Sequence, residues 1–320
     1  MKLYIIGGGA IGGTIGALMK RDGHDVTLCD ADTAHVDAIN RDGLRIEGPV
    51  NDVVVRLPAI SPEALPFGLD RVIVAVKSHH TRAVADLLAP RLNQDGCVLT
   101  VQNGLTADVL TEAVGVSRVI SSFVNFGADL LGPGRILQGN VATFRVGELR
   151  GGQITPRVKE FADALPYAEA TGNVLGYLWG KEAYGAMLWA GAVSDFAIAE
   201  TLEHPRYRPV MVAIAAEVLA QAPVPVESFD GFVASDLEGS LDRLAAFNRQ
   251  SAKSHSGIYR DLAIRKRKTE IDEMLRDVDG PIFRKVASII HDIEDGKRVC
   301  EAANLEELAE YVAELPRLVG

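Results

Sequence analysis

Short apolar runs and helical stretches alternate along the first half of the chain. The runs at residues 3–6 and 72–76 are almost entirely apolar and have the length of a strand. Runs of this kind are typical of parallel strands that are buried on both faces. The stretches at 11–21 and 81–92 repeat apolar residues at helical spacing. This alternation of strand and helix predicts an α/β fold with a doubly wound parallel sheet.

Further elements of the same kind fill the rest of the first half. Thr33 is expected to cap a helix that ends at Gly43. Between residues 126 and 148, glycines separate short strands, which predicts hairpin-like additions at the edge of the sheet. The other expected elements are strands at 25–30, 98–101 and 119–123 and helices at 106–114 and 156–164.

The strand signal nearly vanishes after Val174, and long segments with helical spacing replace it. We therefore place a domain boundary near residue 172. It separates an α/β domain at 1–172 from an all-helical domain at 173–320. The expected helices of the second domain are 178–199, 210–221, 237–247 and 283–293.

A glycine-rich turn directly follows the first expected strand and opens the first expected helix. Its spacing matches the pattern G-x-G-x-x-G. Gly7 permits a tight turn, Gly9 lets the backbone approach a pyrophosphate, and Gly12 allows helix and strand to pack closely. A glycine turn without a ligand is the alternative. The residues expected to bind a dinucleotide are Gly7, Gly9, Ala10, Ile11 and Gly12.

Asp30 ends the second expected strand, 18 residues after Gly12. An acidic side chain at this place accepts hydrogen bonds from the ribose hydroxyls of the adenosine and repels a 2′-phosphate. Asp32 adds negative charge, and no arginine follows directly. The sequence therefore favours NAD(H) over NADP(H), with a turn cap as the alternative role of Asp30.

Two polar residues follow expected strands at the edge where ligands of such sheets bind. Lys77 comes after one strand and Asn103 after the next. We expect both to contact the ligand, although either could instead close a turn, as Asn-Gly pairs commonly do. His79 and His80 lack an obvious third metal ligand, so we expect surface roles for them and no metal site.

The amino-acid composition says little about the fold, but it limits the classes of binding partner. The 320 residues include 33 Lys and Arg but 43 Asp and Glu, giving a net charge of −10. This balance argues against binding to nucleic acid or to an anionic membrane surface. Cys29, Cys97 and Cys300 are far apart and lack metal-ligand spacing. This pattern argues against a disulfide framework, and we expect a protein of the reducing cytoplasm. No apolar run is long enough to span a membrane.

Five segments combine into a recognisable order: the turn at 7–12, Val76-Lys77, VQNG at 101–104, LWGK at 178–181 and KTEID at 268–272. In this order and spacing, over most of the chain, they resemble the ketopantoate reductase family. The resemblance implies an N-terminal Rossmann domain and a helical C-terminal domain. It also implies reduction of a 2-keto acid with a nicotinamide cofactor.

The resemblance implies roles for individual residues as well. Lys181 would be the general acid that protonates the developing alkoxide, because hydride transfer to a carbonyl builds negative charge on oxygen. Glu270 would orient the substrate or cofactor and balance the charge of Lys181. Lys77 and Asn103 would contact the cofactor near the nicotinamide. The alternatives are a solvated helix residue for Lys181 and a surface ion pair for Glu270.

Several positions depart from the family pattern. Family members carry asparagines four and eight residues after the catalytic lysine, where this chain has Gly185 and Trp189. The exchange replaces amide donors with an aromatic wall, which predicts a different 2-keto acid or another carbonyl compound. About one extra residue lies between Asp261 and Glu270. The basic residue with which family members bind a 2′-phosphate, directly after the second strand, is missing; Ala31 and Asp32 occupy these positions.

A polar segment of the second domain offers donors for an anionic substrate. Lys253 and His255 could bind its carboxylate together with Ser256, since a carboxylate needs such donors. Ser256 is also the nearest counterpart of the family's substrate-binding serine. A polar loop between helices is the alternative.

Two other functions remain open at this point. In a hydroxyacid or opine-type dehydrogenase, His255 with Asp261 or Glu270 would form a His–carboxylate pair. A non-catalytic redox sensor would bind NAD(P) without turnover. We expect a homodimer, the commonest oligomeric state, that acts on a small 2-keto or 2-hydroxy acid.

Overall fold

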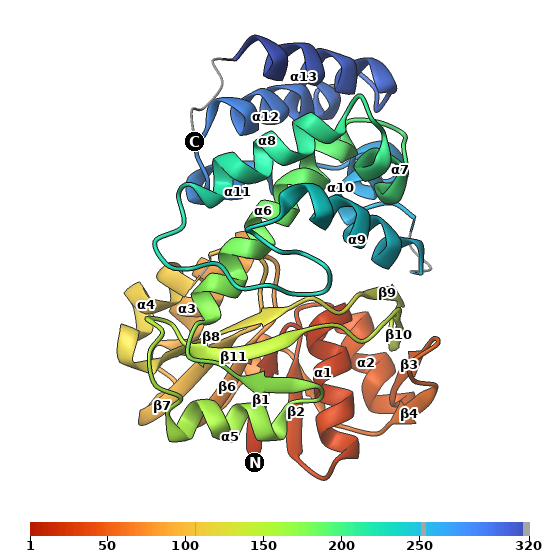
Figure 1. Ribbon diagram of the computed structural model, residues 1–320. Helices are drawn as coiled ribbons and strands as arrows, with labels where there is room; N and C mark the ends of the chain where they lie inside the picture. Colours follow the sequence, from red (N-terminus) through yellow and green to blue (C-terminus); the bar gives the residue numbers. More distant parts are fainter. Residues whose placement is uncertain (106, 251–253, 316–320) are drawn as a thin grey trace. The chain divides into compact units, whose positions relative to one another are not determined.

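The computed structural model describes residues 1–105, 107–250 and 254–315. The chain forms two compact units, Met1–Leu175 and Gly176–Gly320, which we call unit 1 and unit 2 (Figure 1). The sequence placed a boundary near residue 172, and the compact units meet between residues 175 and 176.

Unit 1 is built on an eight-stranded sheet of order β12-β11-β8-β7-β6-β1-β2-β5 (Figure 1). The six strands from β5 to β8 are parallel, and they have the strand order of a Rossmann sheet. β11 runs antiparallel to β8. The predicted doubly wound parallel sheet is confirmed. Its strands are β1 (Lys2–Ile6), β2 (Asp25–Cys29), β5 (Ala59–Ile60), β6 (Leu69–Val74), β7 (Leu92–Thr100), β8 (Val119–Val124), β11 (Phe144–Glu148) and β12 (Ala168–Ala170).

Helices cover both faces of this sheet. One apolar cluster joins Ile73 and Leu99 to α1, α2 and α5, and another joins Val72 and Val98 to α3 and α4. Alternate residues of one strand point to opposite faces, so burial of both faces explains the continuous apolar runs. The helices are α1 (Ala10–Arg21), α2 (Thr33–Asp42), α3 (Thr81–Leu88), α4 (Ala107–Val114) and α5 (Pro156–Ala164).

A second, four-stranded sheet of order β4-β3-β10-β9 packs against α1. The prediction that residues 126–148 extend the edge of the main sheet is wrong for β9 and β10, because β10 pairs with β3. β11 does join the main sheet. The strands of the second sheet are β3 (Leu44–Glu47), β4 (Val53–Val55), β9 (Ala128–Gly132) and β10 (Arg135–Gln138).

α1 lies between the two sheets, and its glycines let it approach both. A Cβ on Gly16 would lie 2.7 Å from the Leu28 Cδ2 in β2. A Cβ on Gly13 would lie 2.5 Å from the Ile136 Cδ1 in β10. Because both distances are far shorter than van der Waals contact, a side chain at either position would push α1 away from a sheet.

α2 begins differently from the prediction. Asp32, not Thr33, is the N-cap, and its carboxylate accepts hydrogen bonds from the backbone N–H groups of Ala34 (3.0 Å) and His35 (3.2 Å). Aspartate and threonine both suit this position, because their side-chain oxygens satisfy N–H groups of the first turn. The helix is followed by Gly43, as predicted, with φ +88°.

Unit 2 consists of helices and turns in its described residues, with one isolated β-bridge between Phe229 and Phe232. The predicted helical character is confirmed, although α7, α11 and α13 were not anticipated. The elements are α6 (Val174–Ala192), which begins in unit 1, α7 (Ile198–Glu203), α8 (Arg208–Leu219), α9 (Leu237–Arg249), α10 (Gly257–Tyr259), a π-helical turn (Arg260–Ile264), α11 (Ile271–Asp277), α12 (Pro281–Glu294) and α13 (Ala302–Glu314).

The predicted helix at 178–199 is wrong at its end, since α6 stops at Ala192. The Val193 carbonyl accepts a hydrogen bond from the Asn304 Nδ2 at 2.8 Å, and Asn304 is buried at the start of α13. The Ser194 hydroxyl bonds to backbone groups on both sides of the break. These contacts replace the partners that the last helical turn lacks.

A buried carboxylate joins α8 to α12. Glu217 is 8% exposed, and its two oxygens accept hydrogen bonds from the backbone N–H groups of Ile282 and Phe283, each at 2.9 Å. These N–H groups lie in the first turn of α12, where the helix dipole favours negative charge. Gly280 leaves the necessary space, because a Cβ there would lie 2.1 Å from the Glu217 carboxyl carbon.

Within the described residues, no helix combines the length and the apolar character needed to cross a membrane. The same residues contain no group of three or more His, Cys, Asp or Glu side chains that could hold a metal ion.

Glu217→Ala is expected to lower the free energy of unfolding of unit 2 by about 2 kcal/mol, because two buried N–H groups lose their acceptor. Urea unfolding measures this change. The control is Glu310→Ala, which removes an exposed carboxylate from α13. Equal midpoints for the two variants would contradict the role assigned to Glu217.

Candidate functional site

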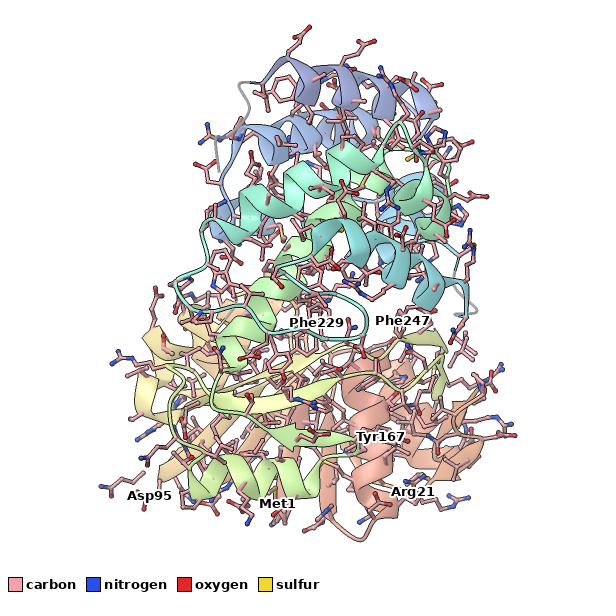
Figure 2. All side chains as sticks on the ribbon, viewed as in Figure 1. Met1, Arg21, Asp95, Tyr167, Phe229 and Phe247 are labelled. Atoms are coloured by element: carbon pink, nitrogen blue, oxygen red, sulfur yellow. The ribbon has the colours of Figure 1, made fainter. Side chains whose placement is uncertain are left out.

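The carboxyl ends of the central parallel strands meet at one edge of the main sheet. The last residues of β1, β2, β6 and β7 are paired with one another. The segments that follow these strands therefore lie side by side, at the edge where ligands of such sheets bind. Met1 and Asp95, at or near the amino ends of β1 and β7, lie at the opposite edge (Figure 2). The predicted residues on these segments are Gly7, Asp30, Lys77 and Asn103.

The turn between β1 and α1 has the geometry that its glycines require. Gly7 has φ +100°, and a Cβ there would lie 2.8 Å from the Ala75 carbonyl carbon. A Cβ on Gly12 would lie 2.0 Å from the Gly7 carbonyl oxygen. Gly9 differs, because a Cβ there would meet no atom of the described residues within 4 Å. The fold therefore requires Gly7 and Gly12, whereas Gly9 keeps a space open beside the turn.

This open space fits a dinucleotide. Gly9 is the N-cap of α1, and having no side-chain oxygen it leaves the N–H groups of the first turn to a ligand. Those N–H groups, together with the positive end of the helix dipole, attract a pyrophosphate. Ala10 and Ile11, the remaining predicted cofactor residues, begin α1 at this point.

Asp30 holds the turn from the side of β2. Its Oδ2 accepts a hydrogen bond from the Gly8 N–H at 2.7 Å, and its Oδ1 accepts one from the Asp32 N–H at 2.9 Å. The Asp30 carboxylate thus caps the turn after β2, as the alternative interpretation of the sequence expected. It also fixes the glycine-rich turn through Gly8. Each carboxylate oxygen can accept a second hydrogen bond, so the half-buried Asp30 can also receive ribose hydroxyls.

Lys77 and Asn103 are exposed, and a residue that the sequence analysis did not single out joins their loops. Gln102 is 7% exposed, and its Nε2 donates hydrogen bonds to the Val76 carbonyl (2.9 Å) and to the Thr81 hydroxyl (2.7 Å). This buried amide ties the end of β7 to the loop after β6. Its signal in the sequence was its place within the Gln-Asn-Gly segment.

In unit 2, Lys181 lies on α6, an apolar helix whose charged side chains are Lys181 and Glu182. Lys181 is half-buried, and Glu182 is 4% exposed. Burial lowers the pKa of Lys181 to about 8, and the negative charge of Glu182 opposes that shift. The amine can therefore gain or lose a proton close to neutral pH. Sequence reasoning missed Glu182, whose signal was a second charge within an apolar helix.

One turn beyond Lys181, Gly185 leaves room on the same face of α6. A Cβ on Gly185 would meet the Met274 Cε at 3.9 Å and no other described atom within 4 Å. Met274 lies on α11, one turn after Glu270, which is the half-buried N-cap of that helix. Lys181 and Glu270 thus each stand one turn before the contact between α6 and α11. Trp189, a further turn along α6, is buried.

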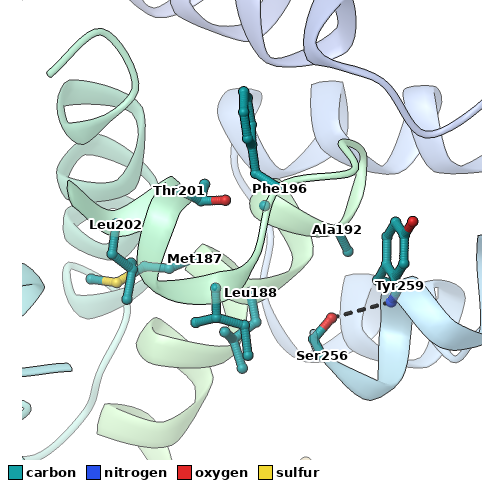
Figure 3. A pocket seen from close by; sticks show the side chains of 10 residues that line it. Met187, Leu188, Ala192, Phe196, Thr201, Leu202, Ser256 and Tyr259 are labelled. Carbon is teal, nitrogen blue, oxygen red and sulfur yellow. Dashed lines mark hydrogen bonds between the residues drawn. The ribbon is translucent and has the colours of Figure 1, made fainter. Parts of the chain in front are cut away.

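Ser256 lies closer to the carboxyl end of α6. Its Oγ accepts a hydrogen bond from the Tyr259 N–H at 3.1 Å and caps α10 (Figure 3). With Leu188 of α6 it lines a hollow of about 10 Å³, the room of one water molecule. Leu188 lies about 10 Å further along the axis of α6 than Lys181. Lys253, the third residue of the predicted anion site, lies outside the described residues.

His255 is held by groups other than a side-chain carboxylate. Its Nδ1 lies 2.9 Å from the Ser254 hydroxyl, and its Nε2 lies 3.2 Å from the Asp195 carbonyl oxygen. Among the described residues, neither ring nitrogen bonds to Asp261 or Glu270. The His–carboxylate pair of the alternative dehydrogenase is therefore not assembled.

A π-helical turn lies in the segment between Tyr259 and Glu270, where the sequence suggests about one extra residue. Within Arg260–Ile264 the helix widens, and the Arg265 N–H donates to the carbonyl group five residues earlier at 2.8 Å. Such a turn holds one residue more than an α-helical turn. The buried Asp261 carboxylate then accepts hydrogen bonds from the side chains of Arg265 and Arg267, which fixes the loop that leads to α11.

Comparison with known proteins identifies the relatives of this chain. Residues 3–151 match the family described as ketopantoate reductase PanE/ApbA. The 2-dehydropantoate 2-reductase of Pyrococcus horikoshii is 29% identical over 286 residues, covering 85% of this chain and 87% of that protein. The 2-dehydropantoate 2-reductase of Halobacterium salinarum is 26% identical over 305 residues, which cover 91% of this chain and 98% of that protein. These comparisons show that the chain is similar to ketopantoate reductases, by family model over residues 3–151 and by sequence over most of its length.

Solved structures of two dehydrogenases or reductases are similar to this chain in fold. A ketopantoate reductase of the family from Ralstonia eutropha superposes with a TM-score of 0.78 at 26% identity, over 93% of this chain and 99% of that chain. D-mandelate dehydrogenase, solved with NADH and anilino(oxo)acetate, gives a TM-score of 0.80 at 21% identity. The superposition covers 92% of this chain and 99% of that chain. At that identity the second likeness shows the fold alone.

Gly9→Ala and Gly12→Ala separate cofactor binding from folding. Gly9→Ala is expected to leave the melting temperature near that of the wild type but to weaken NADH binding by about tenfold, because a methyl group fills the open space. Gly12→Ala is expected to lower the melting temperature, because its methyl group meets the Gly7 carbonyl oxygen. Thermal unfolding and fluorescence titration with NADH measure the two effects. Equal loss of stability in both variants would contradict this division.

Proposed function

We propose that this protein is an NAD-dependent reductase of a 2-keto acid that also oxidises the corresponding 2-hydroxy acid. Two features of the chain carry the proposal together. The turn at Gly9 keeps open a space suited to a pyrophosphate, and burial lowers the pKa of Lys181 to about 8. The similarity to ketopantoate reductases supports an NAD(P)-dependent oxidoreductase that acts on a keto or hydroxy acid.

Lys181 is the proton donor of this proposal. A bound nicotinamide supplies a hydride to the keto carbon, and the electron pair of the C=O π bond moves to the oxygen. The Lys181 ammonium stabilises the negative charge that develops there and donates its Nζ proton to the oxygen. The products would be the hydroxy acid, the oxidised nicotinamide and a neutral Lys181 amine. Glu270 orients the substrate or cofactor, and Lys77 and Asn103 contact the cofactor near the nicotinamide.

The substrate we propose carries an apolar group rather than a hydroxyl next to α6. Gly185 offers space beside Lys181, and the atom nearest to that space is the methyl group of Met274. A substrate hydroxyl placed there would lose its hydrogen bonds to water without gaining a side-chain amide partner at position 185. Trp189 is apolar and adds to this preference. Because its ring is buried, the position that a substrate can reach is that of Gly185.

Ser256 and His255 fit the outer part of a substrate better than its carboxylate. The carboxylate of a 2-keto acid is bonded directly to the keto carbon, so it lies within a few ångströms of the oxygen that Lys181 protonates. Ser256 lines a hollow together with Leu188, which lies about 10 Å further along α6 than Lys181. We therefore propose that Ser256 and His255 face the substituent of a long substrate.

The cofactor preference rests on Asp30. Its carboxylate stands at the end of β2, where the adenosine ribose of a dinucleotide lies in Rossmann domains. A 2′-phosphate would meet this negative charge, whereas ribose hydroxyls can donate to it. We propose a preference for NAD(H) over NADP(H).

We propose that the protein is a homodimer in the cytoplasm. Symmetric dimers are the commonest assemblies of soluble enzymes. The cysteines are free thiols, and burial raises the pKa of Cys29 to about 12, which suits a reducing compartment.

Lys181 is expected to set the dependence of activity on pH. Reduction needs the protonated amine and oxidation needs the neutral amine. Hence kcat/KM should fall for reduction, and rise for oxidation, as the pH increases through about 8. Lys181→Ala should lower kcat by about 10²- to 10⁴-fold. Lys181→Arg should abolish the change near pH 8, because a guanidinium stays protonated. A change that persists in Lys181→Arg would belong to another group.

Initial rates of NADH and NADPH oxidation test the cofactor and the substrate together. The panel contains ketopantoate and 2-keto acids with bulky apolar substituents. We expect faster turnover with NADH and with the apolar substrates. Asp30→Asn keeps an oxygen for the Gly8 N–H but removes the charge, so it should narrow the NADH preference by about tenfold. Faster turnover with NADPH by the wild type would overturn the role of Asp30.

A further inference from the structure

A buried histidine stands directly behind the glycine-rich turn. His35 lies in the first turn of α2 and is 1% exposed. Its Nε2 lies 2.9 Å from the Gly8 carbonyl oxygen, and its Nδ1 lies 3.0 Å from the Gly134 nitrogen in the turn between β9 and β10. The imidazole thus bridges three segments that are far apart in the sequence.

The two partners of His35 fix where its proton lies. The Gly134 N–H can only donate, so the Nδ1 accepts that hydrogen bond. The Nε2 therefore carries the ring proton and donates it to the Gly8 carbonyl oxygen. Each ring nitrogen of His35 therefore has one hydrogen-bond partner.

Gly8 is held from both sides by side chains. Asp30 accepts a hydrogen bond from its N–H at 2.7 Å, and His35 donates one to its carbonyl oxygen at 2.9 Å. The peptide bond between Gly8 and Gly9 is trans, so the Gly9 N–H points opposite to the Gly8 carbonyl. A carbonyl held towards His35 therefore aims the Gly9 N–H away from His35.

We infer that His35 is a positioning residue for the cofactor: its hydrogen bond to the Gly8 carbonyl orients the Gly9 N–H towards the pyrophosphate. This inference rests on the proposed function, because it requires a dinucleotide in the space beside Gly9. Glycine has broad conformational freedom, so a turn of three consecutive glycines loses much backbone entropy when a ligand orders it. His35 and Asp30 fix the central peptide units before the ligand arrives, which reduces that loss.

A histidine that merely fills the core would have different consequences. In that case the bonds to Gly8 and to Gly134 would contribute to stability alone, and either bond could be lost without a selective effect on the cofactor. Two amide side chains distinguish these roles, because each retains one of the two bonds. The Gln Nε2 stands as many bonds from the backbone as the His Nε2, and the Asn Oδ1 stands as many as the His Nδ1.

The experiment compares His35→Gln with His35→Asn. His35→Gln keeps the donor to Gly8 and loses the acceptor for Gly134, whereas His35→Asn does the reverse. Both should melt at a lower temperature than the wild type, since each loses one buried hydrogen bond. The dissociation constant for NADH, measured by fluorescence titration, should stay within about twofold of the wild type in His35→Gln. It should rise about tenfold in His35→Asn, with kcat at saturating NADH nearly unchanged.

Each outcome decides a separate question. Equal dissociation constants in the two variants would overturn the positioning role and leave His35 as a core residue. If His35→Asn does not fold, His35→Gln still decides, because a tenfold weakening there would overturn the inference. A wild-type protein that does not bind NADH would overturn the proposed function and this inference with it.

Discussion

The close approach of the first helix to both sheets is the constraint on which unit 1 depends. Gly12, Gly13 and Gly16 lie where a Cβ would come within 2.0, 2.5 and 2.7 Å of neighbouring atoms, so α1 can pack between the sheets only without side chains there. This packing places the N-terminus of α1 against the carboxyl ends of the strands. The free N–H groups and the helix dipole then face the space beside Gly9. The packing that builds the domain thereby also builds the place for the cofactor.

In unit 2, burial has two different consequences for charged groups. The Glu217 carboxylate is buried but accepts two backbone hydrogen bonds from α12, so it serves the scaffold. Lys181 is half-buried on an apolar helix, and its pKa falls to about 8. A lysine with such a shift is suited to proton transfer, and shifts of this kind concentrate at functional sites. Burial is thus compensated by hydrogen bonds at Glu217, whereas at Lys181 it moves the pKa towards neutral pH.

Two local features shape the segment that leads to α11 and the surface of α6. The helix widens into a π-helical turn at Arg260–Ile264, and the buried Asp261 holds the loop that follows through hydrogen bonds with Arg265 and Arg267. Gly185 leaves room on the surface of α6, where a Cβ would meet the Met274 Cε at 3.9 Å. Because a helix fixes the direction of each side chain, the residue at position 185 decides how much room this face of α6 leaves.

The sequence by itself determined the features whose signals are local. The parallel strands, the helical second unit and the glycine turn at 7–12 followed from periods of apolar residues and from glycine spacing, since these involve neighbours in the chain. Only the tertiary structure decided that β10 pairs with β3, that α6 ends where Asn304 bonds to it, and that His35 and Gln102 bridge loops around the site. Hydrogen bonds between residues so far apart leave no periodic trace in the sequence, because each depends on where the rest of the chain has already folded.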